Sequence, residues 1–289
     1  MASYDVAVAY RIYPKVSKPA SALPFGSDKY LLSKVCLKSF KESLAGLRVK
    51  LWVLLDGCPP EYGDLFRQYF RTEDLVFVEL DHVGNQATFE KQIEILVSQR
   101  DAEAVYFAED DYFYLPRQFA GLLRFLNANT DVHFVSPYDH PDSFRLELHR
   151  HPTSIAVFER RYWSTTGSTC LTFLTKRLTL KTTQHVFRTY CRGNHDCSLW
   201  LSMSKQSVFS LSKFLRCAVS KDQRAQARIL AKAWIYGWRQ ILFGRKWNLW
   251  MPIPGIATHL DASAIPPSVD WLSEMLQKIE AGRVPIISK

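Results

Sequence analysis

The sequence of 289 residues lacks any long apolar run. A membrane-spanning helix requires roughly 18 or more consecutive apolar residues, and no window of the chain supplies them. Asp5 and Arg11 interrupt the N-terminal segment, where a secretory signal would need an apolar stretch. We therefore expect a cytoplasmic protein.

Closely spaced cysteines are missing as well. The six cysteines are scattered along the chain and form no C-x-x-C pair. Zinc ribbons need such pairs, and small disulfide-stabilised domains need a denser set. The sequence thus argues against both classes, and we expect reduced, mostly buried thiols. It also contains no internal repeat and no low-complexity tract, which excludes a repeat array.

The composition is that of a globular protein, but its charge is unevenly distributed. Hydrophobic residues make up 47% and charged residues 22% of the chain, and the net charge is +9. Residues 1–144 contain 15 Lys and Arg against 20 Asp and Glu, whereas residues 145–289 contain 22 against 8. The segment 150–246 alone has 18 basic and three acidic residues. Such a segment attracts polyanions, nucleic acid among them, or anionic lipid surfaces.

Short apolar runs alternate with amphipathic stretches in the first half of the chain. This pattern predicts βαβ units and an α/β fold with a mostly parallel central sheet flanked by helices. Strands are expected over residues 5–10, 49–55, 75–80, 104–108 and 132–136. Helices are expected over residues 29–44 and 61–70, after residues 84–85, and after residue 116.

The second half has a weaker pattern. Residues 138–152 are polar and rich in histidine, which is typical of a long surface loop. Two strands are expected between residues 155 and 175, and helices over residues 178–190, 196–203 and 219–243. The tail from residue 252 has little periodicity until a last helix near residues 268–279.

Three consecutive carboxylates, Glu109, Asp110 and Asp111, follow an apolar strand and precede three aromatic residues. Like charges this close raise one another's pKa unless a cation intervenes. The carboxyl ends of the strands in an open α/β sheet are where ligands bind. Oxygen ligands with at most one imidazole favour Mg²⁺ or Mn²⁺ over Zn²⁺. The alternative is an exposed acidic turn, against which the flanking aromatic residues argue.

A strand followed by Glu-Asp-Asp and aromatic residues, after several βα units, resembles the DxD-type motif of GT-A glycosyltransferases of the family-2-like kind. The resemblance extends over residues 5–200. It implies a Rossmann-like GT-A fold, a nucleotide-sugar donor and a Mn²⁺ or Mg²⁺ cofactor. It further implies that Asp111 ligates the metal and that Asp110 contacts the ribose or the metal shell. Glu109, also expected near the metal, departs from the usual aspartate.

The same resemblance implies which residues hold the nucleotide sugar. Besides Asp110, the expected donor-binding residues are Tyr10, Arg11, Asp56, Asn85, Thr88 and Lys91. Each has a simpler explanation when taken alone: Asp56 can belong to a turn, Asn85 can cap a helix, and Lys91 can lie on a solvated face.

The resemblance divides the chain into a GT-A catalytic domain over residues 1–204 and a helical, basic C-terminal region over residues 205–289. Within the first, residues 1–115 would bind the nucleotide sugar and residues 116–204 the acceptor. The tail of the second would return to the active site.

Asp196 opens an expected helix after the sequence Gly-Asn-His. Helix capping would explain a carboxylate there, because the helix dipole favours it. In inverting members of the resembled family, a carboxylate at such a position removes the proton of the acceptor hydroxyl. Asp196 is therefore the expected catalytic base.

His259 lies in a short turn of the irregular tail. A lone histidine is commonly an ordinary hydrogen-bonded residue, but the resemblance implies a C-terminal histidine that completes the metal coordination. Trp163, Thr166 and His195 are expected at the acceptor site, because aromatic rings with nearby hydroxyls bind sugars. A threonine-rich β-hairpin would look the same and is favoured for residues 163–172.

Basic residues alternate with tryptophans over residues 219–250. This composition is typical of a helix on an anionic membrane, although an amphipathic helix packed on the catalytic domain is the simpler explanation.

The leading hypothesis is a metal-dependent, inverting glycosyltransferase that moves a sugar from a nucleotide-diphosphate sugar to a hydroxyl of a glycan or lipid-linked acceptor. One alternative is a nucleotidyltransferase or phosphohydrolase that uses the acidic triplet. The other is a nucleic-acid-binding protein that uses the basic half, although no helix-turn-helix, RNP-like or zinc-finger pattern is found.

Overall fold

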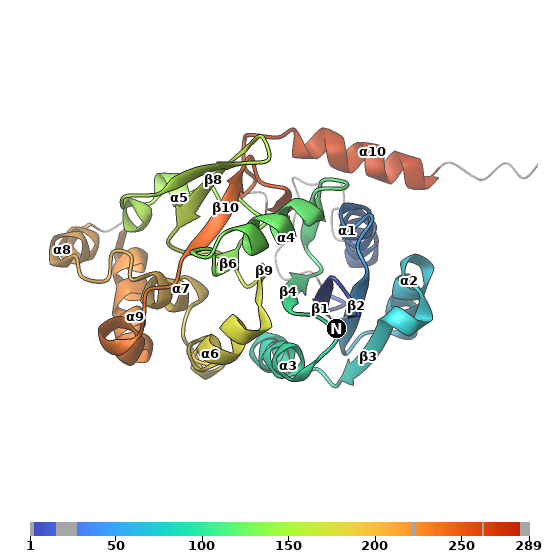
Figure 1. The fold of residues 1–289 in the computed structure, drawn as a ribbon, viewed down its shortest axis with the longest axis horizontal. Helices are drawn as coiled ribbons and strands as arrows, with labels where there is room; N and C mark the ends of the chain where they lie inside the picture. Colours follow the sequence, from blue (N-terminus) through green and yellow to red (C-terminus); the bar gives the residue numbers. More distant parts are fainter. Residues whose placement is uncertain (1–2, 16–27, 221–222, 262, 284–289) are drawn as a thin grey trace, which may run out of the picture.

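The computed structural model describes residues 3–15, 28–220, 223–261 and 263–283 (Figure 1). This part of the chain forms a nine-stranded sheet in the order β3-β2-β1-β4-β9-β6-β10-β8-β7 and a two-stranded sheet, β11-β5. Helices cover both faces of the large sheet (Figure 1).

The N-terminal half of the sheet is parallel. Its strands are β1 (Val6–Ile12), β2 (Val49–Asp56), β3 (Leu75–Leu80) and β4 (Ala104–Glu109). The helices that connect them are α1 (Lys29–Ser43), α2 (Pro60–Tyr69) and α3 (Gly84–Ser98), with a 3-10 turn, η1 (Thr72–Asp74), before β3. β1 is buried along its whole length, because helices cover both of its faces.

The other half of the sheet contains the antiparallel pairs. Its strands are β6 (Phe134–Val135), β7 (Ile155–Phe158), β8 (Arg161–Thr166), β9 (Phe173–Lys176) and β10 (Leu249–Ile253). β9 is antiparallel to β4 and β6, and β8 is antiparallel to β10 and β7. Among the nine described strands of the large sheet, seven run in one direction and β8 and β9 run in the other. The predicted α/β fold with a mostly parallel central sheet flanked by helices is thus confirmed.

Several elements differ from the sequence-based expectation. The remaining helices are α4 (Phe119–Ala128), α5 (Asp142–Arg145), α6 (Arg177–Phe187), α7 (Asp196–Ser204), α8 (Leu211–Val219), α9 (Arg224–Phe243) and α10 (Trp271–Arg283), with 3-10 turns η2 (Glu147–His149) and η3 (Tyr190–Arg192). The expected loop over residues 138–152 contains α5 and η2, and α8 was not predicted. The expected helix over residues 219–243 begins only at Arg224, and residues 221–222 lie outside the described residues.

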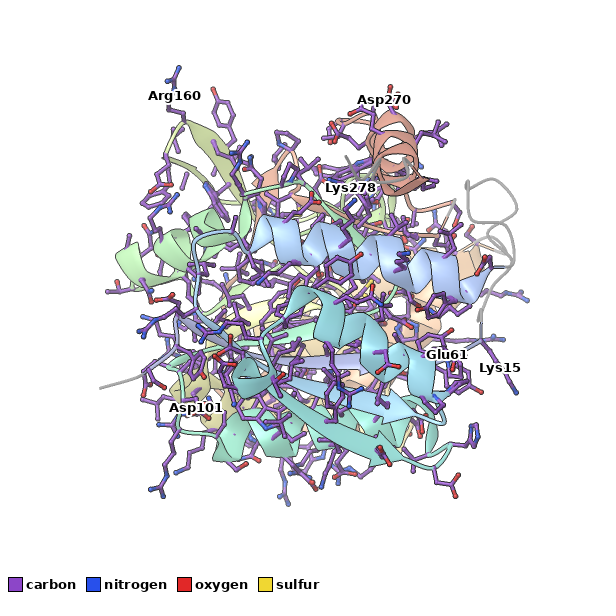
Figure 2. All side chains as sticks on the ribbon, turned by 90° about the vertical axis from the view of Figure 1, so that its right-hand side faces the viewer. Lys15, Glu61, Asp101, Arg160, Asp270 and Lys278 are labelled. Atoms are coloured by element: carbon purple, nitrogen blue, oxygen red, sulfur yellow. The ribbon has the colours of Figure 1, made fainter. Side chains whose placement is uncertain are left out.

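The C-terminal region completes the same sheet as the N-terminal one. β10 lies between β6 and β8, and β11 (Ala257–His259) pairs with β5 (Tyr112–Tyr114). α10 packs on α1 through Trp271 and Met275, and Lys278 forms an ion pair with Glu42 on α1. Figure 2 shows Lys278 between the two helices. Sequence patterns missed β10 because two prolines at 252 and 254 are unfavourable in a central strand.

Two expectations from the sequence concern the cysteines and the absence of a membrane-spanning helix. Cys36 and Cys217 are buried, the other four cysteines are partly buried, and all six are unpaired. Within the described residues, no helix combines the length and the apolar character that crossing a bilayer requires.

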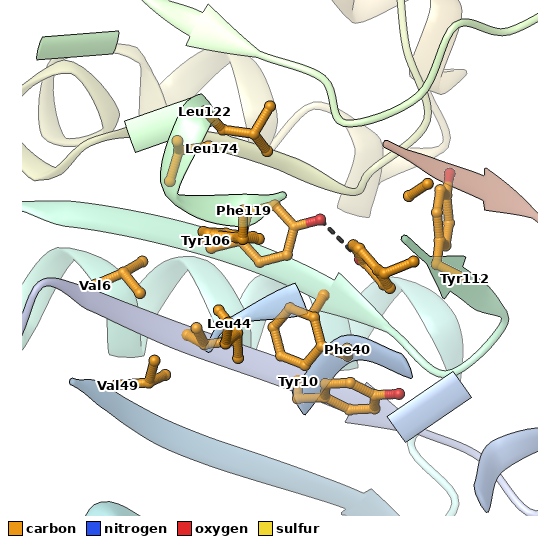
Figure 3. Close-up of a cluster of buried hydrophobic side chains, with 14 of the residues drawn as sticks. Val6, Tyr10, Phe40, Leu44, Val49, Tyr106, Tyr112, Phe119, Leu122 and Leu174 are labelled. Atoms are coloured by element: carbon orange, nitrogen blue, oxygen red, sulfur yellow. Dashed lines mark hydrogen bonds between the residues drawn. The ribbon is translucent and has the colours of Figure 1, made fainter. Parts of the chain in front are cut away.

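The core between α1 and the sheet is aromatic. The ring of Phe40 lies 5.8 Å from Tyr10, 5.9 Å from Tyr106 and 5.0 Å from Tyr114, measured between ring centroids. Figure 3 shows Phe40 among Tyr10, Tyr106 and Phe119. The hydroxyls of Tyr106 and Tyr114 are hydrogen-bonded at 2.7 Å. This cluster supports β4 and β5 on both sides of the acidic triplet.

We predict that Phe40→Ala lowers the free energy of unfolding by about 3–5 kcal/mol, because it leaves a cavity among rings that cannot collapse. Leu178→Ala, at a side chain that is 71% exposed, should change it by less than about 0.5 kcal/mol. Urea unfolding of both variants measures the difference. Similar values for the two variants would contradict the central position of Phe40.

Candidate functional site

A cavity of about 290 Å³ lies at the carboxyl ends of β1, β2 and β4. We call it the strand-end pocket. Its walls come from residues 11–15, the first turns of α1 and α3, Asp56 and the acidic triplet. Parallel strands end at one edge of a sheet, and the helices that follow them begin there. This geometry collects polar side chains from distant parts of the sequence.

Arg11 and Glu109 are partners across β1 and β4, where the two strands end. The guanidinium of Arg11 forms an ion pair with Glu109 and donates a hydrogen bond to the side-chain oxygen of Asn85. The hydroxyl of Thr172 donates to the second oxygen of Glu109 at 2.7 Å. Both oxygens of Glu109 therefore have partners within the chain, and Glu109 orients Arg11.

Gln92 joins the same two strands beneath the pocket. Its amide nitrogen donates to the carbonyl oxygens of Ala9 at 2.7 Å and Ala108 at 3.1 Å. Sequence analysis missed Gln92. The signal in the sequence is a glutamine at helical spacing from Phe89 and Ile93, on the apolar side of α3, where the structure buries it fully.

Asp110 is held by Lys29 and by the backbone. The Nζ of Lys29 lies 2.7 Å from its Oδ2, and the amide of Tyr13 donates to the same oxygen at 3.2 Å. Burial raises the pKa of Asp110 above its ordinary value, Lys29 opposes this, and the charge of Asp111 adds to it. Sequence analysis did not identify Lys29. Its position as the first residue of α1 is the signal, because that helix begins at the edge where β1 ends.

Asp111 pairs with His259 on β11, a strand of the C-terminal segment. The Nε2 of His259 lies 3.1 Å from Oδ2 of Asp111. β11 aligns His259 with Tyr112, and the amide of Leu260 donates to the carbonyl of Asp111 at 2.8 Å. The small β11–β5 sheet thus fixes the position of the imidazole.

The two groups also determine each other's charge. Burial alone would raise the pKa of Asp111, but His259 outweighs it and brings that pKa to about 2. Burial opposes protonation of His259, but the carboxylate of Asp111 raises its pKa to about 9. The other oxygen of Asp111, Oδ1, is buried and has no hydrogen-bond partner.

The chain itself offers few metal ligands. No group of three or more His, Cys, Asp or Glu side chains that could hold a metal ion is found in the described ranges. The unpartnered Oδ1 of Asp111 fits a hard divalent ion. Nε2 of His259 could join it as a ligand after releasing the proton that the carboxylate of Asp111 stabilises. Mg²⁺ is commonly held by one or two carboxylates together with substrate phosphates. The residues present therefore fit an ion whose coordination is completed by a bound phosphate compound.

Asp56, Asn85 and Thr88, which were predicted to bind the donor, all line the strand-end pocket. The carboxylate of Asp56 accepts hydrogen bonds from the amides of Val83 at 2.7 Å and Gly84 at 2.9 Å. Gly84 has a φ of +82°, which favours glycine. The hydroxyl of Thr88 donates to the carbonyl of Gly84 at 2.7 Å. These contacts fix the start of α3 and so the side chain of Asn85.

The side chains of Tyr10 and Lys91 lie outside the pocket, in contrast to the prediction. The ring of Tyr10 is 1% exposed and packs on Phe40 and Phe66 in the core. Side chains alternate along a strand, so Tyr10 and Arg11 point to opposite faces of β1. Lys91 is exposed on α3 and pairs with Glu94 at 3.1 Å.

A second cavity, of about 150 Å³, surrounds Asp196. We call it the Asp196 pocket, and His140, His149, Ser168, Cys170 and His195 are among its walls. α7 begins at Asp196 itself, whose Oδ1 lies 2.7 Å from Nδ1 of His195. Burial by itself would raise the pKa of Asp196, but the hydrogen bond and charge of His195 outweigh it and lower that pKa. Asp196 is therefore a carboxylate at neutral pH.

The two pockets are neighbours. Cys170 lines the Asp196 pocket, and Thr172, two residues further on, binds Glu109 at the strand-end pocket. From the other side, the amide of Asn85 donates at 2.9 Å to the hydroxyl of Tyr190, which precedes Asp196 by six residues. Asp196 thus belongs to the same region of the molecule as the acidic triplet.

Trp163 and Thr166 do not line the Asp196 pocket, in contrast to the prediction for the acceptor site. Trp163 is 2% exposed and its ring stacks on Phe125 with the centroids 3.8 Å apart. Thr166 is buried, and its hydroxyl donates to the carbonyl of Ser168 at 3.2 Å. The hairpin favoured for residues 163–172 is not formed, because β8 ends at Thr166 and pairs with β7 and β10, and residues 167–172 connect it to β9 without strand structure. His195, the third predicted acceptor residue, does line the pocket.

The similarity of this chain to known proteins is low. No protein-family model matches the sequence, and no curated protein matches it. Among solved structures, the chain is similar to the mannosyltransferase PcManGT from Pyrobaculum calidifontis in complex with GDP-Man and Mn²⁺, with 12% identity, a TM-score of 0.38, and coverage of 84% of this chain and 88% of that one. It is also similar to a mycobacterial protein, with 14% identity, a TM-score of 0.34, and coverage of 61% of this chain and 55% of that one. Similarities this low do not define a family for the chain.

His149, in the wall of the Asp196 pocket, makes the stability of the folded protein depend on pH. It is 7% exposed, its Nδ1 is buried without a partner, and burial lowers its pKa to about 4. An unfolded histidine titrates near 6.5. Between these values the unfolded chain binds a proton that the native chain does not, so native stability falls as the pH falls through this interval.

We predict that protonation of this histidine lowers the free energy of unfolding by up to ~3 kcal/mol between about pH 7 and pH 4. His149→Gln should remove this part of the pH dependence, whereas His185→Gln, at an exposed position of α6, should keep it. Urea unfolding at several pH values measures the slopes. If the free energy of unfolding of His149→Gln depended on pH as steeply as that of the wild type, His149 would not be the residue responsible.

Proposed function

We propose that this chain is a metal-dependent glycosyltransferase that uses a nucleotide-diphosphate sugar and inverts the configuration at the anomeric carbon. The observation that carries the proposal is the strand-end pocket, where Asp110, Asp111 and His259 meet two buried cations, Arg11 and Lys29. Next to it is a second pocket with its own carboxylate, Asp196.

The charges of the strand-end pocket support a diphosphate ligand bound together with a metal ion. Among its described lining residues, three are cationic (Arg11, Lys15 and Lys29) and four are carboxylates. A diphosphate entering this set needs a further positive charge. Asp111 and His259 would hold the divalent ion, which neutralises the charge of the departing nucleoside diphosphate. Because the chain supplies so few ligands, metal binding should depend on the nucleotide.

The remaining parts of the donor would contact the rim of the pocket. Asn85 and Asp56 lie where a ribose or base can reach them, and both are fixed by hydrogen bonds to their surroundings. Arg11 and Lys29 would bind the phosphate oxygens as charge-assisted donors. Their own carboxylate partners, Glu109 and Asp110, keep both cations in position before the donor arrives.

Asp196 is the proposed base. The acceptor hydroxyl would give its proton to the Asp196 carboxylate while its oxygen bonds to the anomeric carbon of the sugar. The bond from that carbon to the diphosphate oxygen breaks in the same step, and the electron pair leaves with the nucleoside diphosphate. A single displacement inverts the configuration. The hydrogen bond of His195 keeps the carboxylate ionised and oriented.

A nucleotidyltransferase or phosphohydrolase could use the same acidic triplet. The separate Asp196 pocket favours glycosyl transfer, because it provides an acceptor space with a base beside the strand-end pocket. A nucleoside triphosphate, without any response to nucleotide sugars, would instead favour the alternative.

The first prediction concerns the donor and the metal. A nucleotide-diphosphate sugar together with Mn²⁺ should raise the melting temperature more than either compound alone, because each completes the binding site of the other. Asp111→Asn and His259→Gln should weaken the Mn²⁺ response by at least ~10-fold. Asp64→Asn, at an exposed carboxylate of α2, is the control. A response to nucleoside triphosphate alone would refute the proposed donor class.

The second prediction concerns the base. Asp196→Asn should lower turnover by at least ~10²-fold while leaving the affinity for donor and metal nearly unchanged. Glu61→Gln, at a carboxylate in the first turn of α2, controls for a loss of helix-dipole stabilisation alone. Melting temperatures of both variants separate stability from catalysis. Full turnover in Asp196→Asn would exclude it as the base.

A further inference from the structure

Helices α8 and α9 lie together at one end of the molecule, far from α1 and α2 (Figure 1). Both present large apolar side chains to solvent. Leu211 is 70%, Val219 81% and Phe243 79% exposed. We call the exposed apolar residues of the two helices, together with two exposed arginines of α9, the α8–α9 face: Leu211, Leu215, Val219, Ile235, Trp238, Leu242, Phe243, Arg228 and Arg239.

The apolar side of α8 points outward. Leu211, Leu215 and Val219 follow one another at intervals of four residues, which places them on one face of the helix. The residues of α8 that are buried are Lys213 and Cys217. A surface helix of a globular protein normally turns its apolar face to the core. The reversed orientation indicates a surface that contacts something outside the chain.

The exposed cations of α9 accompany its apolar residues. Arg239 lies over the ring of Trp238, 5.2 Å from its centroid. No described carboxylate forms an ion pair with Arg228 or Arg239. The sequence from residue 197 to residue 260 contains a single acidic residue, Asp222, which lies outside the described residues. The two charged residues of this face are therefore both positive, and the carboxylate of Glu147, on η2 beside α8, is paired with Arg216.

We propose that the α8–α9 face binds the surface of an anionic lipid bilayer. Its leucine, valine, phenylalanine and tryptophan side chains would enter the boundary between headgroups and acyl chains, and its arginines would contact lipid phosphates. Protruding aliphatic side chains give no advantage on nucleic acid, which is bound chiefly through cations. A second copy of the chain would bring two positive faces together, which like charges disfavour.

The other side of α9 is tied to the helix that carries Asp196. The hydroxyl of Ser198 donates to the carbonyl of Ile229 at 2.8 Å, and Nζ of Lys232 donates to the carbonyl of Gly193 at 2.9 Å. At Gly237, a Cβ atom would lie 2.5 Å from that of Ser202, so the two helices are in close contact.

Bilayer contact would therefore hold the Asp196 pocket, which Ile229 lines, close to the membrane. This step rests on the proposed function, and it makes a lipid-linked acceptor the substrate class.

Vesicle co-sedimentation of the full chain tests the proposal without donor or metal, so the result does not depend on glycosyl transfer. The protein should bind vesicles of phosphatidylcholine with phosphatidylglycerol, bind phosphatidylcholine alone much more weakly, and lose affinity as salt increases. The double variant Leu215→Glu/Val219→Glu should reduce binding by at least ~10-fold. Arg228→Glu/Arg239→Glu should reduce it as well and remove most of the salt dependence.

The matched control is Ile155→Glu/Val157→Glu. These two side chains of β7 are 70% and 68% exposed, but they lie outside the α8–α9 face, so the control should bind vesicles like the wild type. All the substituted side chains are exposed, and melting temperatures verify that each variant is folded.

Four results would overturn the proposal. The first is that Leu215→Glu/Val219→Glu binds vesicles as well as the wild type does, and the second is that the wild type does not bind them. The third is a dimer in light scattering that this variant dissociates, which would identify a second copy as the occupant. The fourth is salt-sensitive DNA binding that depends on the same leucine and valine. Failure of glycosyl transfer with intact vesicle binding would overturn the proposed function and leave the docking surface.

Discussion

Three adjacent carboxylates, buried or partly buried at one edge of the sheet, each need a positive partner, and the arrangement of the site depends on where these partners come from. Glu109, Asp110 and Asp111 are adjacent in the chain, yet each faces a different cation: Arg11, Lys29 and His259 in that order. These partners come from β1, α1 and β11. The separation relieves the repulsion within the triplet. It also leaves one oxygen of Asp111 unpartnered, which makes this carboxylate the group most available to a further cation.

The C-terminal segments have a structural part in this site. β10 joins the large sheet between β6 and β8, and β11 then passes beside β5 directly after the triplet. α10 packs on α1, whose first residue, Lys29, binds Asp110. The tail therefore restrains both sides of the acidic triplet. The α/β core and the segments that follow residue 204 contribute strands to one sheet, and residues from both line one region of the molecule.

The two sides of α9 have different surroundings. One side packs closely on α7 through Gly237 and Ser202, and so helps to fix the position of Asp196. The other side exposes Trp238 and its arginine neighbours. In the proposed enzyme, a helix of this kind would connect the surface that meets the acceptor's membrane with the base that activates the acceptor. The acidic half of the chain would hold the donor and, together with His259, the metal.

The sequence alone determined the order of the βα units, the strand before the acidic triplet and the helix that starts at Asp196, because apolar periodicity and helix-start signals act over short stretches of chain. It also identified Arg11, Asp56, Asn85, Thr88 and His259 as residues of one region. Only the tertiary structure revealed Lys29 and Gln92, whose partners are remote in the sequence, and it moved Tyr10 and Trp163 into the core. The outward orientation of α8 was equally beyond the sequence. Periodicity defines an apolar face, but the packing of the whole chain decides whether that face is buried.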